Sequence, residues 1–219
     1  MKLGKPNDYL DKRSIRLRSI DRSIAQYRFS ASELKKKFSD KLDDHTALFL
    51  KGFGNEVNLL SAFRDLFFNS RELLDLLLVE LNKATSDTAA QTPRDFLPFA
   101  KILMRGVFDQ KGLPTLTFLK TNITYIFNIR KVRNEIKNNP TNIEFAFNTD
   151  HFEARFRVPI KADEVELVQY LDIANKDEAV RNISCRYTYN LDAIFPEMLE
   201  FWKTAFSLFD IDIKHLTSG

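Results

Sequence analysis

The sequence predicts a mainly α fold, a helical bundle of about five to seven helices with one β-hairpin inserted at about residues 143–158. Three observations carry this prediction. Hydrophobic residues make up 44% of the 219 residues, enough for a sizeable core, and only 6 residues are glycine, so tight turns are few. Apolar residues recur with a helical period along most of the chain and with a period of 2 in one segment. We therefore expect a single helical domain over residues 1–219.

The first half of the chain is dominated by helical patterns. Residues 8–42 predict one long polar helix or two shorter ones, and residues 46–83 predict the dominant helix or helix pair. Residues 84–94 are rich in Thr, Ser and Ala and contain Pro93, so they predict a loop. Residues 95–108 predict a further helix.

A second strongly periodic segment covers residues 114–138. Pro114 suits the first turn of a helix, because its missing N–H has no partner there in any case. The run Asn138-Asn139-Pro140 predicts the end of that helix, since proline cannot continue it. The sequence thus predicts one continuous helix over 114–138.

The period then changes to 2, which predicts two antiparallel strands. Apolar side chains alternate with polar ones over 143–147 and again over 152–158, with 148–151 as the turn. A lone hairpin is marginal in water, so its Phe-rich face must pack on the helices or on another chain. Residues 163–174 then predict a short acidic helix, 176–187 are ambiguous, and 189–209 predict the closing helix.

Charge is unevenly distributed along the chain. Residues 1–41 hold 12 Lys or Arg against 5 Asp or Glu, so 1–42 forms a basic N-terminal helical segment. Residues 163–200 hold 9 acidic against 3 basic side chains. The basic segment could track phosphates, or it could meet the acidic region of the same chain or of a second copy, as in a homodimer.

Several classes of site and location are not expected. One cysteine, Cys185, favours a reducing, cytoplasmic compartment. The start of the chain has no apolar run typical of a signal peptide, and no run is long enough for a membrane span. Cys185 and the three histidines (His45, His151 and His215) are scattered, so we expect no metal. No glycine-rich phosphate motif is present, so we expect no cofactor.

Polar residues on the apolar side of the predicted helix 114–138 are the main functional signal. At about 100° per residue, Asn122 and Arg133 both point toward the core. A buried arginine needs partners, either internal carboxylates or carbonyls, or the phosphate of a ligand. The candidate ligand-binding residues are Arg133, Asn134, Arg130, Lys137 and Asn122, and Arg133 is the sole catalytic candidate.

The pair Arg133-Asn134, late in a helix of a bundle, resembles the HEPN superfamily. That family's motif is Arg, a polar residue and then a His four to six residues further on. The resemblance implies a module that binds RNA, a nucleotide or a partner protein, often in toxin–antitoxin or defence systems. In its ribonucleases the Arg holds phosphate and the His transfers protons, usually between two copies. Here Asn138, Asn139 and Pro140 occupy the window of the His.

This departure predicts binding without catalysis, because Asn cannot transfer a proton near neutral pH. The leading hypothesis is a non-catalytic HEPN-like module that binds RNA, a nucleotide or a partner protein. One alternative is a structural or assembly protein that dimerises through its basic and acidic helical surfaces. A further alternative is a ribonuclease with a non-sequential His, His151, folded back toward Arg133.

Overall fold

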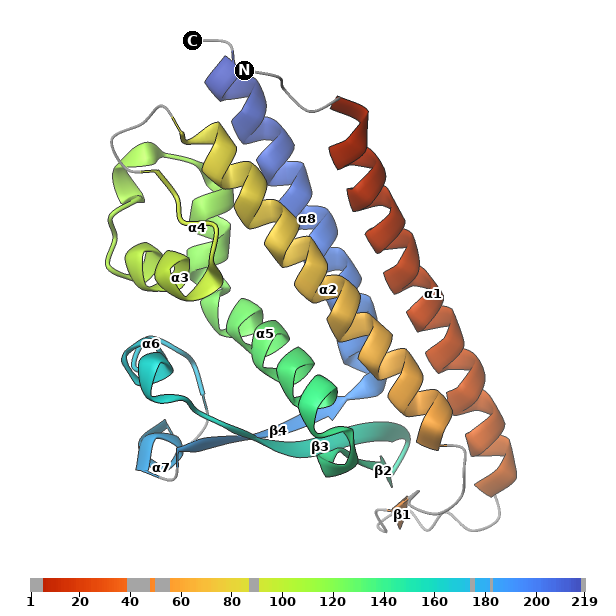
Figure 1. Cartoon of the computed structure of the whole chain (residues 1–219). Helices are drawn as coiled ribbons and strands as arrows, with labels where there is room; N and C mark the ends of the chain where they lie inside the picture. The colour runs from red at the N-terminus through yellow and green to blue at the C-terminus, as the bar shows by residue number, and fades with distance from the viewer. Residues whose placement is uncertain are drawn as a thin grey trace. The chain divides into compact units, whose positions relative to one another are not determined.

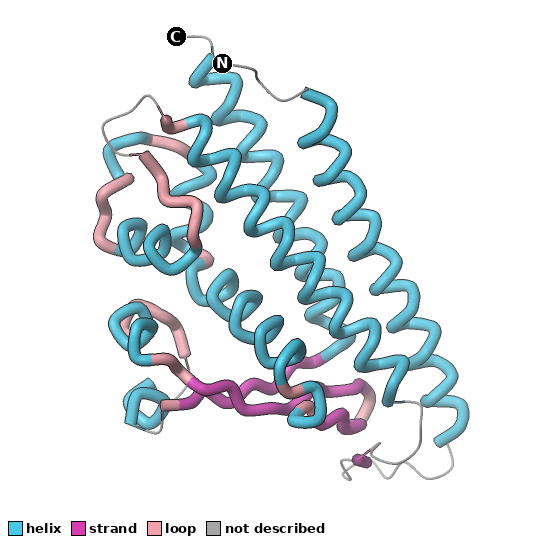
Figure 2. The backbone as a smooth tube through the Cα atoms, viewed as in Figure 1, coloured by secondary structure: helices cyan, strands magenta, loops and turns pink. Residues whose placement is uncertain are grey.

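The computed structural model describes residues 6–38, 48–49, 56–86, 91–173, 176–181 and 183–217. Its α-helices are α1 (Pro6–Phe38), α2 (Glu56–Ala84), α3 (Phe96–Met104), α4 (Pro114–Thr121), α5 (Ile123–Asn138), α6 (Val165–Val168), α7 (Lys176–Arg181) and α8 (Leu191–Thr217). Its strands are β1 (Leu48–Phe49), β2 (Glu144–Asn148), β3 (His151–Pro159) and β4 (Ser184–Asn190). The mainly α fold with an inserted β-hairpin is confirmed (Figures 1 and 2).

The chain divides into two compact units. The first contains Met1–Ser70, Lys131–Val158 and Arg186–Glu200, and the second contains Arg71–Arg130, Pro159–Cys185 and Phe201–Gly219. Helices α2, α5 and α8 therefore contribute residues to both units. Each unit buries apolar side chains of its own.

In the first unit, α1 packs against α2 and the start of α8. Arg16 of α1 donates a hydrogen bond to Asn69 of α2 at 3.3 Å, and the ring of Tyr27 stacks on Phe195 of α8 at 4.6 Å. Helical spacing brings one stripe of α1 into the core, formed by Ile20, Ile24, Tyr27, Ala31 and Leu34. Over the described residues, the predicted segment 8–42 is thus a single helix, α1, ending at Phe38.

The sheet has four strands in the order β1-β2-β3-β4, so the predicted hairpin is its centre. β2 and β3 pair antiparallel from Glu144↔Arg155 to Asn148↔His151, which leaves a two-residue turn at Thr149 and Asp150. Thr149 has φ 55°, the left-handed conformation that such tight turns require. β4 resolves the ambiguous segment 176–187 into α7 followed by a strand.

The apolar face of the sheet packs on α2 of the same chain. The ring of Phe63 lies 6.1 Å from the rings of both Phe145 and Phe156, and Phe67 lies 5.7 Å from Tyr189. Period-2 alternation puts these sheet side chains on one face, and the helical period brings Phe63 and Phe67 to meet them. The expectation that the Phe face must be covered is therefore met within one chain.

The predicted helix 46–83 was wrong at its start. α2 begins at Glu56, and Leu48 and Phe49 form strand β1, which pairs antiparallel with β2 through Leu48↔Phe147 and Phe49↔Ala146. A segment that lies beside an open strand edge can pair with it through backbone hydrogen bonds, and the local periodicity of the sequence cannot reveal such a distant partner. The rest of 46–55 lies outside the described residues.

In the second unit, aromatic side chains of α4, α5 and α8 share a core. Phe201 of α8 lies 5.1 Å from Phe118 and 4.7 Å from Tyr125, measured between ring centroids. Asp212 of α8 accepts the backbone N–H of Thr115 at 3.0 Å and so caps α4, whose start at Pro114 is confirmed. Within the described part of the loop 84–94, Asn82 holds the chain by donating to the carbonyl of Thr92.

The predicted helix 114–138 is interrupted at Asn122, where α4 ends and α5 begins one residue later. Asn122 has φ −102° and ψ 26°, and its side-chain amide donates to the carbonyl of Phe118 at 2.9 Å. An Asn side chain that competes for the backbone in this way loosens a helix. The Ile126 N–H still donates to the Asn122 carbonyl at 3.2 Å, so the interruption is local.

The acidic segment 163–174 is less helical than predicted. It contains the 3₁₀ turn Ala162–Glu164 and the four-residue helix α6, followed by a bend. The Glu164 carboxylate accepts the backbone N–H of Lys161 at 2.9 Å, as in a capping box at the start of this turn. Among the helices of the described residues, none combines the length and apolarity needed to cross a membrane.

Candidate functional site

Arg133 of α5 is half-buried in the first unit, on the side that the helix phase predicts. Its guanidinium lies over the ring of Phe68, 4.8 Å from the centroid, and its Nη1 donates to Asn134 at 3.2 Å. Its Nε is buried and makes no hydrogen bond. Across the described ranges, no carboxylate pairs with Arg133.

This environment leaves part of the hydrogen-bonding capacity of the Arg133 guanidinium unused. The face of an aromatic ring attracts a cation by about 0.5–2 kcal/mol, but it does not satisfy the N–H donors. Asn134 contributes one neutral acceptor. A guanidinium held in this way keeps donors available for an anion, since charge-assisted hydrogen bonds to phosphate or carboxylate are the strongest it forms.

The other predicted residues of the first unit lie on the same helix. Asn134 is half-buried and accepts the bond from Arg133, while Lys137 is exposed one turn later. Asn138, which stands in the family's His window, is also exposed. The three side chains Arg133, Asn134 and Lys137 are thus close along the last two turns of α5.

Arg130 and Asn122 belong to the second unit, and both are engaged there. Arg130 Nη1 lies 2.7 Å from the Glu164 carboxylate, and its guanidinium lies 5.6 Å from the ring centroid of Phe96. The Glu164 side chain is 1% exposed, so this pair is a structural one. The side-chain amide of Asn122 donates a hydrogen bond to the carbonyl of Phe118 in α4. Both side chains thus already have internal partners in the second unit.

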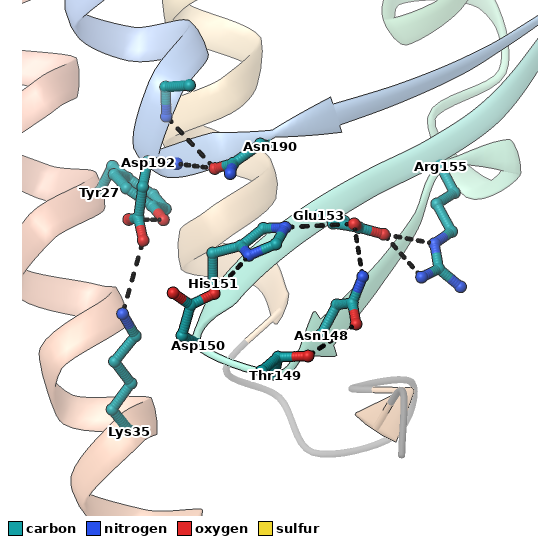
Figure 3. Close-up of polar contacts among 11 residues, drawn as sticks. Tyr27, Lys35, Asn148, Thr149, Asp150, His151, Glu153, Arg155, Asn190 and Asp192 are labelled. Atoms are coloured by element: carbon teal, nitrogen blue, oxygen red, sulfur yellow. Dashed lines mark hydrogen bonds and ion pairs between the residues drawn. The ribbon is translucent and has the colours of Figure 1, made fainter. Parts of the chain in front are cut away.

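A second polar cluster, not predicted as such, lies at the turn of the β2–β3 hairpin (Figure 3). His151 Nδ1 is 2.7 Å from Asp150, and its Nε2 is 3.2 Å from Glu153. Glu153 is 7% exposed and also accepts from Asn148 at 2.9 Å and from Arg155 at 2.8 Å. Both ring nitrogens of His151 therefore face carboxylates, an arrangement that suits the doubly protonated imidazolium.

These contacts shift the pKa values of His151, Glu153 and Asp150. Burial lowers the pKa of His151, but the hydrogen bonds to Asp150 and Glu153 outweigh it, and the net pKa lies above its ordinary value. Burial raises the pKa of Glu153, yet the bonds from Asn148, Arg155 and His151 bring it below its ordinary value. The hydrogen bond from His151 likewise lowers the pKa of Asp150, with help from the charge of Lys35.

Lys35 also connects α1 to the start of α8. Its ammonium lies 3.5 Å from Asp192, which accepts a hydrogen bond from the hydroxyl of Tyr27 at 2.5 Å (Figure 3). Asn190, two residues earlier, accepts the backbone N–H of Asp192 at 2.9 Å and caps α8. The basic helix α1 thus meets the acidic segment 163–200 within one chain at this pair.

His151 does not meet Arg133. Its polar partners in the described chain are Asp150 and Glu153, so the geometry for a non-sequential Arg–His pair is not formed here. His215 is exposed at the end of α8, and His45 lies outside the described residues. Within the described ranges, no group of three or more His, Cys, Asp or Glu side chains is arranged to hold a metal ion.

Some of this geometry had a signal in the sequence. Every second residue of β3 from 151 to 155 is polar, so a strand puts His151, Glu153 and Arg155 on one face. Side chains of opposite charge on one face predict a cluster of ion pairs. The contact of Phe68 with Arg133 had no such signal, because a phenylalanine next to Phe67 is typical of a helix core.

Comparison of the chain with family models, with curated proteins and with solved structures finds no significant match.

Proposed function

We propose that this chain is a non-catalytic, HEPN-like helical module that binds single-stranded RNA through Arg133. The observation that supports this most is the environment of Arg133, a half-buried guanidinium over Phe68 with a buried, unsatisfied Nε and no carboxylate partner in the described chain. A phosphate oxygen suits the remaining Nη donors of this half-buried guanidinium. Asn134 orients the guanidinium, and Lys137 adds a positive charge one turn away.

The proposal is for binding without cleavage. The carboxamide of Asn138 neither gains nor loses a proton near neutral pH, and both ring nitrogens of His151 lie against carboxylates. An imidazole whose two nitrogens are engaged cannot take a proton from an attacking hydroxyl without breaking one of these contacts. RNA contact through Arg133 therefore does not by itself assemble an acid–base pair.

The test is a mobility-shift titration with a labelled panel of single-stranded RNAs at two salt concentrations, read for shift and cleavage together. We compare wild type with Arg133→Ala, with Arg133→Lys, and with Arg64→Ala as a control. Arg64 is an exposed arginine of α2 in the same unit, next to Asp65. Binding should weaken at least tenfold in Arg133→Ala, partly recover in Arg133→Lys, and stay unchanged in Arg64→Ala.

Each alternative has its own signature. An assembly protein should show a mass that rises with concentration while ignoring RNA. A ribonuclease should cut the RNA and lose cleavage in both Arg133→Ala and His151→Ala. Absence of any shift from a folded wild-type protein, verified by circular dichroism, overturns the RNA proposal.

A further inference from the structure

The outward face of α1 carries an exposed stripe of two arginines and a phenylalanine, Arg18, Arg22 and Phe29. At about 100° per residue, positions 18, 22 and 29 fall within about 40° of one another, opposite the buried stripe of Ile20, Tyr27 and Leu34. All three are exposed, and the exposed fraction of Phe29, 71%, is the highest of the exposed large apolar residues described.

The arginines of this stripe are not used by the fold. Arg18 Nε donates to the carbonyl of Ser14 at 3.3 Å, which keeps the side chain along the helix, and Arg22 makes no ion pair within the described residues. Lys36 continues the same line but is paired with Glu33 at 3.0 Å. Lys35, which meets Asp192, projects from a different side of α1. Two guanidinium groups therefore stay available on the outward face.

An exposed phenylalanine in line with unpaired arginines matches one ligand chemistry better than others. Single-stranded nucleic acids are bound by positive side chains that follow the backbone and by aromatic rings that stack on bases. The stripe extends about 16 Å along the helix, at about 1.5 Å per residue, which spans several nucleotides. A helix lying in a membrane surface needs a broad apolar face, whereas the large apolar side chains exposed on this face of α1 are Phe29 and, about 21 Å away along the helix at 1.5 Å per residue, Ile15.

We infer that the stripe of Arg18, Arg22 and Phe29 is a second contact for single-stranded RNA, with the arginines on phosphates and Phe29 stacked on a base. The inference rests on the proposed function, because it names the same ligand. It adds a surface remote in sequence from Arg133 and contributed by a different helix of the same unit.

The test uses the full chain and fluorescence anisotropy with a labelled single-stranded RNA and with an abasic oligonucleotide of equal length. Arg18→Gln/Arg22→Gln should weaken binding and reduce the slope of log K against log salt by about 1.4, since each single-strand phosphate contact contributes about 0.7. Arg28→Gln is the matched control, because Arg28 is an exposed arginine of the same helix that lies about 100° off the stripe. It should change affinity less than twofold.

Variants of Phe29 separate the contribution of base stacking from that of the arginine charges. Phe29→Ala should weaken RNA binding by about 5- to 140-fold, the range that one lost base stack gives, without changing the salt slope. Phe29→Tyr should restore binding. The abasic oligonucleotide should not distinguish Phe29→Ala from wild type, because it has no bases to stack. Equal loss with both ligands overturns the stacking role.

The outcomes distinguish this inference from the proposed function. Stripe variants that bind like wild type, beside an Arg133→Ala variant that does not, overturn the inference alone. Stripe variants that lose binding while Arg133→Ala keeps it support the stripe and overturn the Arg133 site. Two further results overturn the stripe as an RNA surface: sedimentation with anionic vesicles that depends on Phe29, and a concentration-dependent mass that Phe29→Ala abolishes.

Discussion

The hydroxyl of Tyr27 donates a hydrogen bond of 2.5 Å to the carboxylate of Asp192, which follows 165 residues later in the chain. The Tyr27 ring stacks on Phe195 at 4.6 Å, one turn further along α8. Burial, then the bond and charge of Asp192, raise the pKa of Tyr27 far above its ordinary value, so the hydroxyl stays a donor at every working pH. One side chain thus joins the first helix of the chain to the last through both its ring and its hydroxyl.

Tyr27→Phe should keep the ring stacking and lose the hydrogen bond, at a cost of about 1 kcal/mol in the free energy of unfolding. Tyr27→Ala should cost about 3–5 kcal/mol, because it also leaves a cavity where a 2% exposed side chain lay. Urea denaturation followed by circular dichroism measures both. Equal losses in the two variants would mean that the hydroxyl, not the ring, holds α1 to α8.

His151 should make stability depend on pH. Its pKa is raised on folding, so its stabilising contribution is fully present below about 6.5, the ordinary value, and is lost as the pH rises through the raised value. The lowered pKa values of Asp150 and Glu153 work in the other direction, and their contributions are lost as the pH falls through those lowered values. The cluster therefore contributes most in between, in mildly acidic solution.

The groups around His151 are Asp150, Glu153 and, through them, Lys35 of α1 and Arg155 of β3. Comparison of wild type with His151→Gln, by urea denaturation at a series of pH values, should show a difference in unfolding free energy that is present below about pH 6.5 and fades as the pH rises through the raised pKa of His151. His215→Gln is the control, since His215 is exposed at the end of α8. A difference that stays constant over this range would contradict the prediction.

The ion pair between Arg130 and Glu164 should be costly to break from one side. Glu164 is 1% exposed and lies 2.7 Å from Arg130 Nη1, so Arg130→Met removes the Arg130 cation from beside a buried carboxylate, at a cost of about 3–5 kcal/mol. In the double variant Arg130→Met/Glu164→Gln no charge remains, and the loss should be smaller than in Arg130→Met alone. Thermal unfolding of wild type, of Arg130→Met and Glu164→Gln singly, and of the double variant gives the coupling energy. A double variant less stable than Arg130→Met would contradict it.

Two buried polar groups at the start of α4, the carboxylate of Asp212 from α8 and the hydroxyl of Thr115, should behave in opposite ways. Asp212 is 1% exposed and caps α4 through the backbone N–H of Thr115, so Asp212→Ala should cost about 1–2 kcal/mol. The Thr115 hydroxyl is buried without a hydrogen-bond partner in the described chain, so Thr115→Val should be neutral or stabilising. Chemical denaturation measures both changes. A clear loss in Thr115→Val would show that the hydroxyl has a partner, such as a bound water.

Features that depend on neighbours along the chain were predictable. The apolar spacing of α1 and α8 and the alternation over 143–158 specify helices and a hairpin, because both periods arise from local backbone geometry. The phase of α5 likewise placed Arg133 half inside. The interruption at Asn122 was missed because the pattern stays periodic across it, while the cause is one side-chain bond to Phe118.

The sequence by itself determined the mainly α class, the position of the hairpin and the side of α5 that Arg133 occupies. Only the tertiary structure decided that Leu48–Phe49 and Ser184–Asn190 extend the hairpin into a four-stranded sheet, since strand pairing joins residues far apart in the chain. It also decided which partner each charge finds. Arg130 meets the buried carboxylate of Glu164, whereas Arg133, three residues on, meets the ring of Phe68 and Asn134. Periodicity gives a direction for a side chain, and only the packed chain supplies what lies in that direction.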